Sequence, residues 1–302
     1  MDDLHAKIQK LKKEKNAVIL AQYYVPDEVQ AEADYIGDSY YLAKTAAKTD
    51  ADMIVFCGVN FMGESAKILS PDKTVLMPDL RADCPMAHMI TEKKVKEVRG
   101  RYDDLAVVCY INSTAKIKTF SDVCVTSSNA VNIVKKLPNK NIFFIPDGNL
   151  GQYVKEQVTE KNVILNNGYC PTHNSMKLSE LKQLKKDHPN AKVLTHPECR
   201  KEVLELSDYI GSTSGIIACA ERMEDKEFIV CTEQGVGYEL KKRCPDKEFY
   251  FAQRGFICPN MKMNTLEKLC SCMENNSGVI EIDEELRRKS LIPLNRMLEL
   301  GE

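Results

Sequence analysis

Four of the twelve cysteines stand directly before a proline, and three of these, Cys84, Cys170 and Cys258, recur at intervals of 86 and 88 residues. Proline fixes φ and donates no hydrogen bond, so each thiol should sit at a stiff corner of the chain. Thiolates hold iron–sulfur clusters. A four-iron cluster with three protein ligands leaves one iron open, and that iron can act as a Lewis acid on a substrate oxygen. The spacing therefore predicts a three-thiolate site.

Two other interpretations of these cysteines stay open. Structural zinc usually takes four ligands in close pairs such as CxxC; no CxxC occurs here, but Cys258 could form a local set with Cys270 and Cys272. The three thiols could also be buried as small hydrophobic groups, as we expect for Cys57 and Cys109, which lie within apolar runs. No secretory signal is evident, so we expect no disulfide framework.

The segments that must position these cysteines repeat about every 87 residues. AVILAQYY, AVVCYINS and KVLTHPEC are each a short apolar run that ends in polar groups. Two sets of residues recur at intervals of 88 and 86, namely Gln22, Tyr110 and His196, and then Asp34, Asp122 and Asp208. A repeat at a fixed period indicates that the fold is built from similar units.

Short apolar strands that alternate with helices are typical of parallel sheets covered on both faces. We therefore predict an α/β fold of three homologous three-layer αβα sandwich units, related by a pseudo-threefold axis around a central site. The expected units are residues 1–90, 91–177 and 178–264, each with one of the three cysteines, and residues 265–302 are expected to form closing helices. Ligands bind beyond the carboxyl ends of parallel strands, so three such edges should converge.

Charge and hydropathy narrow the possible partners and the compartment. The 42 basic and 44 acidic residues are mixed along the chain, so we expect neither a nucleic-acid nor a membrane partner. The N-terminal run MDDLHAKIQKLKKEKN has the pattern of an amphipathic helix and lacks the features of a signal peptide. No apolar run approaches the roughly 20 residues of a membrane span, so a cytoplasmic location is expected.

A series of motifs along nearly the whole chain resembles the quinolinate synthase family: GDSYYLA, VFCGVNFMGESAKIL, YINSTA, TSSNA, PDGNLGQYV, GYCPTH, HPEC, GSTSG and CPNMKMNTLEKL. The resemblance implies an enzyme of NAD biosynthesis that condenses iminoaspartate with dihydroxyacetone phosphate to quinolinate, with loss of phosphate and two waters. It also implies a 4Fe-4S cluster on Cys84, Cys170 and Cys258, and a supply of iminoaspartate from an aspartate-oxidising enzyme.

The same resemblance assigns catalytic roles to Tyr24, Tyr110, His196 and Glu198. A phenol can donate or accept a proton, although either tyrosine could instead close a strand end. His196 and Glu198 lie two residues apart in HPEC and are the preferred acid–base pair.

Seven further residues are predicted to bind substrate, namely Gln22, Ser39, Asn112, Ser127, His173, Ser212 and Thr213. Hydroxyls and backbone N–H groups at helix starts suit phosphate and carboxylates, while ordinary helix capping is the alternative. His173 could instead orient the loop of Cys170. Many family members have histidine where this chain has Gln22, and an amide cannot exchange protons near neutral pH. Glu233 also matches the family, with a solvated loop carboxylate as its alternative.

Three further interpretations remain at this point. The same cysteines could serve a non-catalytic iron–sulfur sensor or scaffold, or the chain could be a zinc-dependent aldolase-like enzyme. The C-terminal run SLIPLNRMLEL could be a helix near the mouth of the site or simply a packed final helix.

Overall fold

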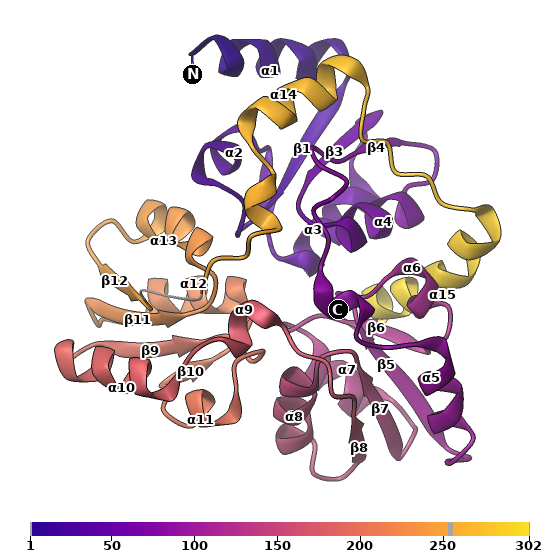
Figure 1. Ribbon diagram of the computed structural model, residues 1–302, viewed down its shortest axis with the longest axis vertical. Helices are drawn as coiled ribbons and strands as arrows, with labels where there is room; N and C mark the ends of the chain where they lie inside the picture. The colour runs from indigo at the N-terminus through magenta and orange to yellow at the C-terminus, as the bar shows by residue number, and fades with distance from the viewer. Residues whose placement is uncertain (1, 253–255, 302) are drawn as a thin grey trace.

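The protein folds into three four-stranded parallel sheets, and the computed structural model describes residues 2–252 and 256–301. The strand orders are β2-β1-β3-β4, β6-β5-β7-β8 and β10-β9-β11-β12. Each order is the previous one shifted by four strands, so the three units share one topology. Figure 1 shows them arranged around a common centre. The predicted α/β fold of three repeated units is confirmed.

The first two units have matching elements. The first contains β1 (Ala17–Gln22), β2 (Tyr35–Gly37), β3 (Met53–Cys57), β4 (Thr74–Leu76), α1 (Asp2–Glu14), α2 (Asp27–Glu32), α3 (Ser39–Lys48), α4 (Asn60–Leu69) and η1 (Pro85–His88). The second contains β5 (Leu105–Tyr110), β6 (Val123–Val125), β7 (Asn141–Ile145), β8 (Asn162–Leu165), α5 (Glu92–Arg99), α6 (Ala115–Lys118), α7 (Ala130–Lys136), α8 (Gly148–Gln157) and α9 (Pro171–Asn174).

The third unit follows the same order and is followed by two closing helices. It contains β9 (Lys192–Thr195), β10 (Tyr209–Ile210), β11 (Glu227–Cys231), β12 (Glu248–Phe251), α10 (Leu178–Asp187), α11 (Lys201–Leu204), α12 (Thr213–Arg222), η2 (Gln234–Val236), α13 (Gly237–Arg243) and η3 (Met261–Met263). The closing helices are α14 (Leu266–Asn275) and α15 (Glu284–Leu300). The unit boundaries by residue number stay a prediction.

One hydrogen-bond pattern recurs in all three units and explains the repeated aspartates. In each unit the carboxylate accepts a backbone N–H of the first strand, and the aspartate N–H returns a bond of 2.9 Å to the carbonyl of that same residue. The carboxylate pairs are Ile19 with Asp34 at 2.8 Å, Val107 with Asp122 at 2.6 Å, and Val193 with Asp208 at 2.8 Å. These two hydrogen bonds fix the position at which the second strand begins beside the first.

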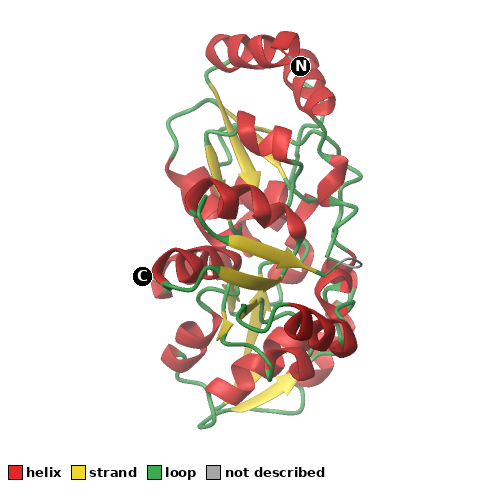
Figure 2. Cartoon of the chain, turned by 90° about the vertical axis from the view of Figure 1, so that its left-hand side faces the viewer, coloured by secondary structure: helices red, strands yellow, loops and turns green. Residues whose placement is uncertain are grey.

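The sheets are covered by helices on both faces, as their apolar sequences require. All six residues of β5 are buried, and so are all five of β3. Figure 2 shows the strands enclosed between helices. One continuous hydrophobic core joins the first two units and part of the third, while the side of the third sheet that faces α10 and α11 has a separate core around Leu181, Val193 and Val203.

The C-terminal segment packs against the first two units. Helix α14 packs against α1 and β3, and α15 packs against α4, α6 and β6. Between them, Gly278 O accepts the N–H of Met77 at 2.8 Å, which extends the edge of the first sheet. Gly278 has φ +73°, and a Cβ there would collide with Met77 O, so this crossing requires glycine. None of the described residues of α15 lines the central cavity.

Among the described residues, no helix combines the length and the apolar character that crossing a membrane requires.

Candidate active site

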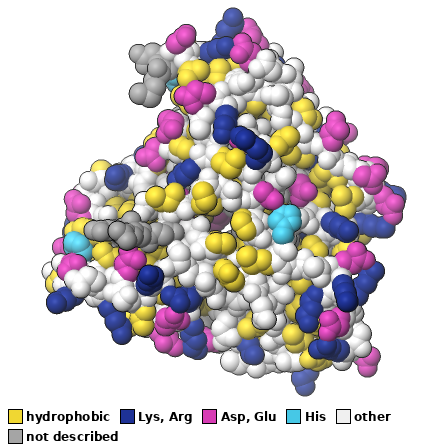
Figure 3. All heavy atoms as spheres, in the orientation of Figure 1, with side chains coloured by type: hydrophobic (Ala, Val, Ile, Leu, Met, Phe, Trp, Pro, Cys, Tyr) yellow, Lys and Arg dark blue, Asp and Glu magenta, His cyan; other side chains and the backbone are white. Residues whose placement is uncertain are grey.

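A central cavity of about 130 Å³ lies where the three units meet. Its walls include residues at the carboxyl ends of β1, β5 and β9, as expected for ligands of parallel sheets. On the face shown in Figure 3, hydrophobic side chains gather near the centre, and acidic and basic side chains are interspersed around the periphery.

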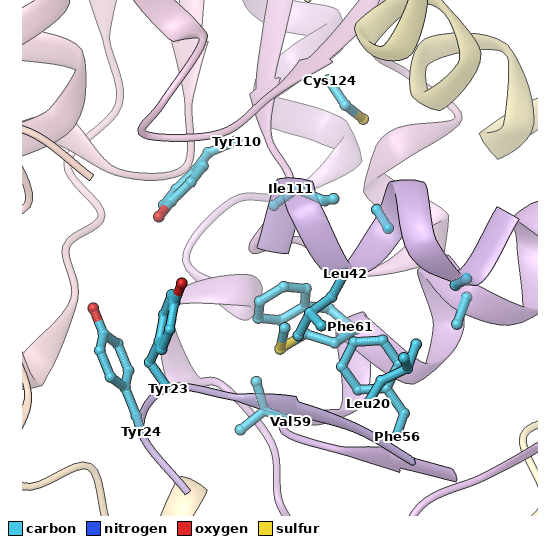
Figure 4. Close-up of a cluster of buried hydrophobic side chains, with 14 of the residues drawn as sticks. Leu20, Tyr23, Tyr24, Leu42, Phe56, Val59, Phe61, Tyr110, Ile111 and Cys124 are labelled. Atoms are coloured by element: carbon cyan, nitrogen blue, oxygen red, sulfur yellow. The ribbon is translucent and has the colours of Figure 1, made fainter. Parts of the chain in front are cut away.

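The cavity brings together nearly all of the residues that the sequence singled out. It is lined by Gln22, Tyr24, Ser39, Cys84, Tyr110, Asn112, Ser127, Cys170, His173, His196, Glu198, Thr213, Glu233 and Cys258. Figure 4 shows the hydroxyl groups of Tyr24 and Tyr110, from different units, directed into the space between them.

Ser212 is the exception among the predicted site residues. Its hydroxyl caps α12 by accepting the Gly215 N–H at 3.2 Å, and it lines a separate surface groove together with Ser127 and Tyr209. The next residue, Thr213, faces the cavity. Ser212 therefore has the capping contact that was its alternative, and a contact with substrate stays a prediction.

Cys84, Cys170 and Cys258 differ from the other nine cysteines, including Cys244, which also precedes a proline. All twelve are free thiols, but only Cys84, Cys170 and Cys258 are partly exposed, and all three line the cavity. Burial and the neighbouring Cys258 help to raise the pKa of Cys84 to about 12. Burial raises the pKa of Cys170 well above its usual value, with added repulsion from Glu198 and Cys84. The thiols are therefore close enough to influence one another's ionisation.

The three thiols fit an iron–sulfur cluster better than a structural zinc ion. Soft thiolate ligands suit such a cluster, and no fourth cysteine of the described chain lines the cavity. Cys270 and Cys272 are buried on α14 and do not line it. The local set of Cys258, Cys270 and Cys272 is therefore not brought together.

One smaller group could hold a single metal ion. Ligand atoms of Cys170, His173 and Glu198 lie within 4.8 Å of one another. A cysteine, a histidine and a carboxylate can bind catalytic zinc. His173 Nδ1 is 2.7 Å from Glu198 Oε2, a hydrogen-bonding distance that already accounts for the proximity of these two side chains.

A chain of hydrogen bonds connects Tyr24 with Glu198. Tyr24 Oη is 2.9 Å from Thr232 Oγ1, and Thr232 Oγ1 is 2.9 Å from His173 Nε2. The other ring nitrogen of His173 contacts Glu198. Tyr24 Oη also contacts Thr213 Oγ1 at 2.5 Å. Thr232 was missed by the sequence analysis, although its place directly after β11 is the strand-end position that such reasoning favours.

His196 and Glu198 have opposite charge preferences. Burial, together with the His173 ring, lowers the pKa of His196 to about 3 despite the opposing effect of Glu198. Burial opposes the charge of Glu198, but His173 and His196 outweigh it and lower its pKa to about 2. His196 Nδ1 accepts the Glu198 N–H at 3.3 Å, and Nε2 is 3.2 Å from Ser127 Oγ. Near neutral pH the site thus holds a neutral imidazole beside a carboxylate.

The lowered pKa of His196 predicts that the stability of the folded protein depends on pH. Below pH 6.5 the unfolded chain protonates His196 while the folded protein does not until about pH 3, so acidification should favour unfolding in that range. Between pH 7.5 and pH 5.0, protonation of this group in the unfolded chain should lower the free energy of unfolding by about 2 kcal/mol. In urea unfolding of the holoprotein, the free energy of unfolding of His196→Asn should fall less on acidification than that of the wild type. The control His188→Asn, outside the cavity, should keep the wild-type dependence; an unchanged slope in His196→Asn would contradict the prediction.

Gln22 and Glu233 each accept a backbone hydrogen bond at the edge of the cavity. Gln22 is buried, and its Oε1 accepts the Tyr24 N–H at 2.5 Å, so the amide shapes the turn that presents Tyr24. Glu233 is fully buried, so its alternative as a solvated carboxylate is wrong. Its Oε1 accepts the Cys258 N–H at 3.0 Å, and Asp83 Oδ1 similarly accepts the Cys84 N–H at 2.7 Å.

A cavity that combines three cysteines with buried imidazole, carboxylate and phenol groups is the site of an enzyme. The model of the quinolinate synthetase A protein family matches residues 6–299. The chain is 57% identical to the quinolinate synthase of Fusobacterium nucleatum subsp. nucleatum over 98% of both chains. It is 52% identical to that of Caldicellulosiruptor bescii, over 99% of this chain and 98% of the relative, and 50% identical to that of Clostridioides difficile over 99% of each. The chain belongs to the quinolinate synthase family.

Proposed function

We propose that this enzyme condenses iminoaspartate with dihydroxyacetone phosphate to form quinolinate, with release of phosphate and two waters. The observation that supports this most directly is the convergence of one cysteine from each unit on a cavity that also contains acid–base groups. The relatives share 48–57% identity over nearly their whole length and are named quinolinate synthases. The place of the reaction is NAD biosynthesis.

Cys84, Cys170 and Cys258 are the residues proposed to hold a 4Fe-4S cluster. When bound, the cluster would supply a Lewis acid at the iron that has no protein ligand. The thiols must lose their protons to bind iron, and their raised pKa values mean that this loss accompanies loading.

The chain from Tyr24 to Glu198 is proposed to move protons during enolisation and dehydration. As the Tyr24 phenol accepts a proton from the substrate, it can pass its own proton through the Thr232 hydroxyl to His173, because each step spans a hydrogen-bond distance. The phenol thus stays protonated, as its burial favours. Glu198, ionised and 2.7 Å from His173, stabilises the imidazolium that results. Tyr110 also donates to Glu198, which leaves its phenol positioned at the other side of the cavity.

Neutral groups are proposed to hold the substrate carboxylates and phosphate. Ser39 begins α3 and Thr213 begins α12, so their hydroxyls and nearby backbone N–H groups can bind anions. Ser127 and Asn112 offer further polar atoms, and Asn112 Oδ1 is buried without a hydrogen-bond partner. No lysine or arginine of the described chain lines this cavity. Ser212 remains a proposed contact that would require movement of its capping hydroxyl.

The source of iminoaspartate and the compartment are further parts of the proposal. An imine of aspartate hydrolyses in water, so an aspartate-oxidising enzyme should supply it in the same compartment. We place that compartment in the cytoplasm, consistent with the mixed surface charge.

Anaerobic purification followed by metal analysis and assay tests the proposal. We expect iron and acid-labile sulfide in equal amounts, and quinolinate formation from the two substrates. A coloured cluster with no turnover would support the sensor alternative instead. Zinc without sulfide would support a zinc-dependent aldolase-like enzyme, for which the group Cys170, His173 and Glu198 is the specific observation.

Thr232→Val should lower kcat by about 100-fold, because valine has the same shape but cannot relay a proton, and such transfers contribute about 100- to 10,000-fold. Thr232→Ser keeps the hydroxyl and should recover most of the activity. The iron content should be unchanged in both variants. Steady-state kinetics with quinolinate detection measure the effect. Equal rates for the valine and serine variants would exclude this role for the hydroxyl.

A further inference from the structure

The segment that carries Tyr24 belongs to the first unit but is also hydrogen-bonded to the third unit. The fully buried Gln30 Nε2 donates to the carbonyls of Tyr23 and Val25 at 2.9 and 3.0 Å, and to Gly235 O at 3.0 Å. A Cβ at Gly235 would lie 2.7 Å from Tyr23 O and 2.8 Å from Tyr24 Cα. The two backbones are therefore in direct contact.

Lys262 completes this junction. Its Nζ donates to Tyr24 O at 2.6 Å and lies 3.1 Å from Glu233 Oε1. The same carboxylate oxygen accepts the Cys258 N–H at 3.0 Å, and Glu233 Oε2 accepts the Gly235 N–H at 2.6 Å. One lysine thus connects the loop of a cluster cysteine with the backbone of the proposed catalytic tyrosine.

Lys262 balances the charge of the buried Glu233 from outside the substrate cavity. A fully buried carboxylate such as Glu233 is costly unless it is paired and hydrogen-bonded. Lys262 supplies the positive charge, but it does not line the central cavity and so does not touch the space for substrate. The Tyr24 phenol meets Thr213 and Thr232, which also belong to the third unit. Tyr24 is therefore held by the third unit at both its backbone and its hydroxyl.

We propose that Lys262 is a positioning residue, which joins the Cys258 loop to the Tyr24 backbone so that the phenol stays within reach of Thr213 and Thr232. The expected effect of this positioning on turnover rests on the proposed function. Misplacement of a catalytic group by about 1 Å can cost about 100-fold in rate. Loss of the junction should therefore act on kcat rather than on substrate affinity.

Kinetics of anaerobically prepared holoenzyme variants test the first part. Lys262→Met should lower kcat by about 10- to 100-fold with KM within about twofold, and Lys262→Arg, which keeps charge and donors, should recover most of kcat. Lys268→Met is the matched control, since Lys268 Nζ also donates to a carboxylate (Asp79 Oδ2, 2.8 Å) and a backbone carbonyl (Met263 O, 2.9 Å). It should retain near-wild-type kcat. If Lys262→Met does not fold, Lys262→Gln replaces it, with the same expected loss.

Fluorine NMR tests the geometry without requiring turnover. In protein labelled with 3-fluorotyrosine, the Tyr24 resonance is the one absent from Tyr24→Phe. It should shift in Lys262→Met and remain in place in Lys268→Met. An unmoved Tyr24 resonance, an unchanged kcat, or equal losses in both lysine variants would overturn the proposal. If wild type forms no quinolinate, the proposed function fails, and the fluorine spectra still decide whether Lys262 positions Tyr24.

Discussion

Replacing Cys84, Cys170 or Cys258 by alanine is expected to remove the visible absorption of the cluster and reduce quinolinate formation by more than about 100-fold. Loss of groups that only support a metal ligand already costs about 10- to 100-fold, so loss of a ligand should cost more. The three cysteines line one cavity, each from a different unit. The effect should therefore be similar wherever along the chain the change is made.

Cys57→Ala provides the matched control for these variants. Cys57 is fully buried in β3 and does not line the cavity. Removing its sulfur should lower stability slightly while iron, sulfide and activity stay at wild-type levels. Iron and sulfide analysis together with the assay measure the difference. Retention of the full cluster by any one of the three cavity variants would show that its cysteine is not a ligand.

Glu198→Gln is expected to lower kcat by about 100- to 10,000-fold while iron and sulfide remain unchanged. Glutamine preserves the size of the side chain but cannot carry the negative charge that stabilises a protonated His173. The charged form is strongly preferred in the folded protein, because the neighbouring imidazoles lower the pKa of Glu198 to about 2 against the effect of burial. The carboxylate is therefore ionised near neutral pH.

The same variant separates two kinds of metal site. If Glu198 were a ligand of a single zinc ion together with Cys170 and His173, then Glu198→Gln should release the metal. Glu202→Gln on the neighbouring helix α11 serves as the control, because Glu202 pairs with Arg200 and does not line the cavity; it should leave kcat and metal content unaltered. Loss of metal from Glu198→Gln would contradict the proposed acid–base role and favour the zinc alternative.

Much of the architecture could be predicted because it depends on short sequence patterns that recur along the chain. The strand ends, the aspartates and the three cavity cysteines recur at nearly constant intervals, and the hydrogen bond between each aspartate and its strand explains the recurrence of the aspartates. The topology of parallel sheets then places the strand ends on one side. The three cysteines follow from this reasoning without any knowledge of contacts.

Contacts between units could not be predicted in the same way. Thr232 meets Tyr24, which is 208 residues away, and nothing in the surrounding residues marks a threonine for such a contact. Ser212 and Thr213 are adjacent and chemically alike, yet the first turn of α12 directs one into a groove and the other into the cavity. Glu233 resembled a loop carboxylate because its partners Cys258 and Lys262 come from a distant turn. The catalytic and binding roles stay predictions.

The packing of α14 on the first unit constrains the order of events during synthesis. Domains generally fold from the N-terminal end as the chain leaves the ribosome, but β3 and α1 are covered by a helix that ends at Asn275. The earliest-made unit must therefore wait, with apolar surface uncovered, until almost the entire polypeptide has emerged. A nascent chain stalled before residue 266 should consequently be a target for chaperones.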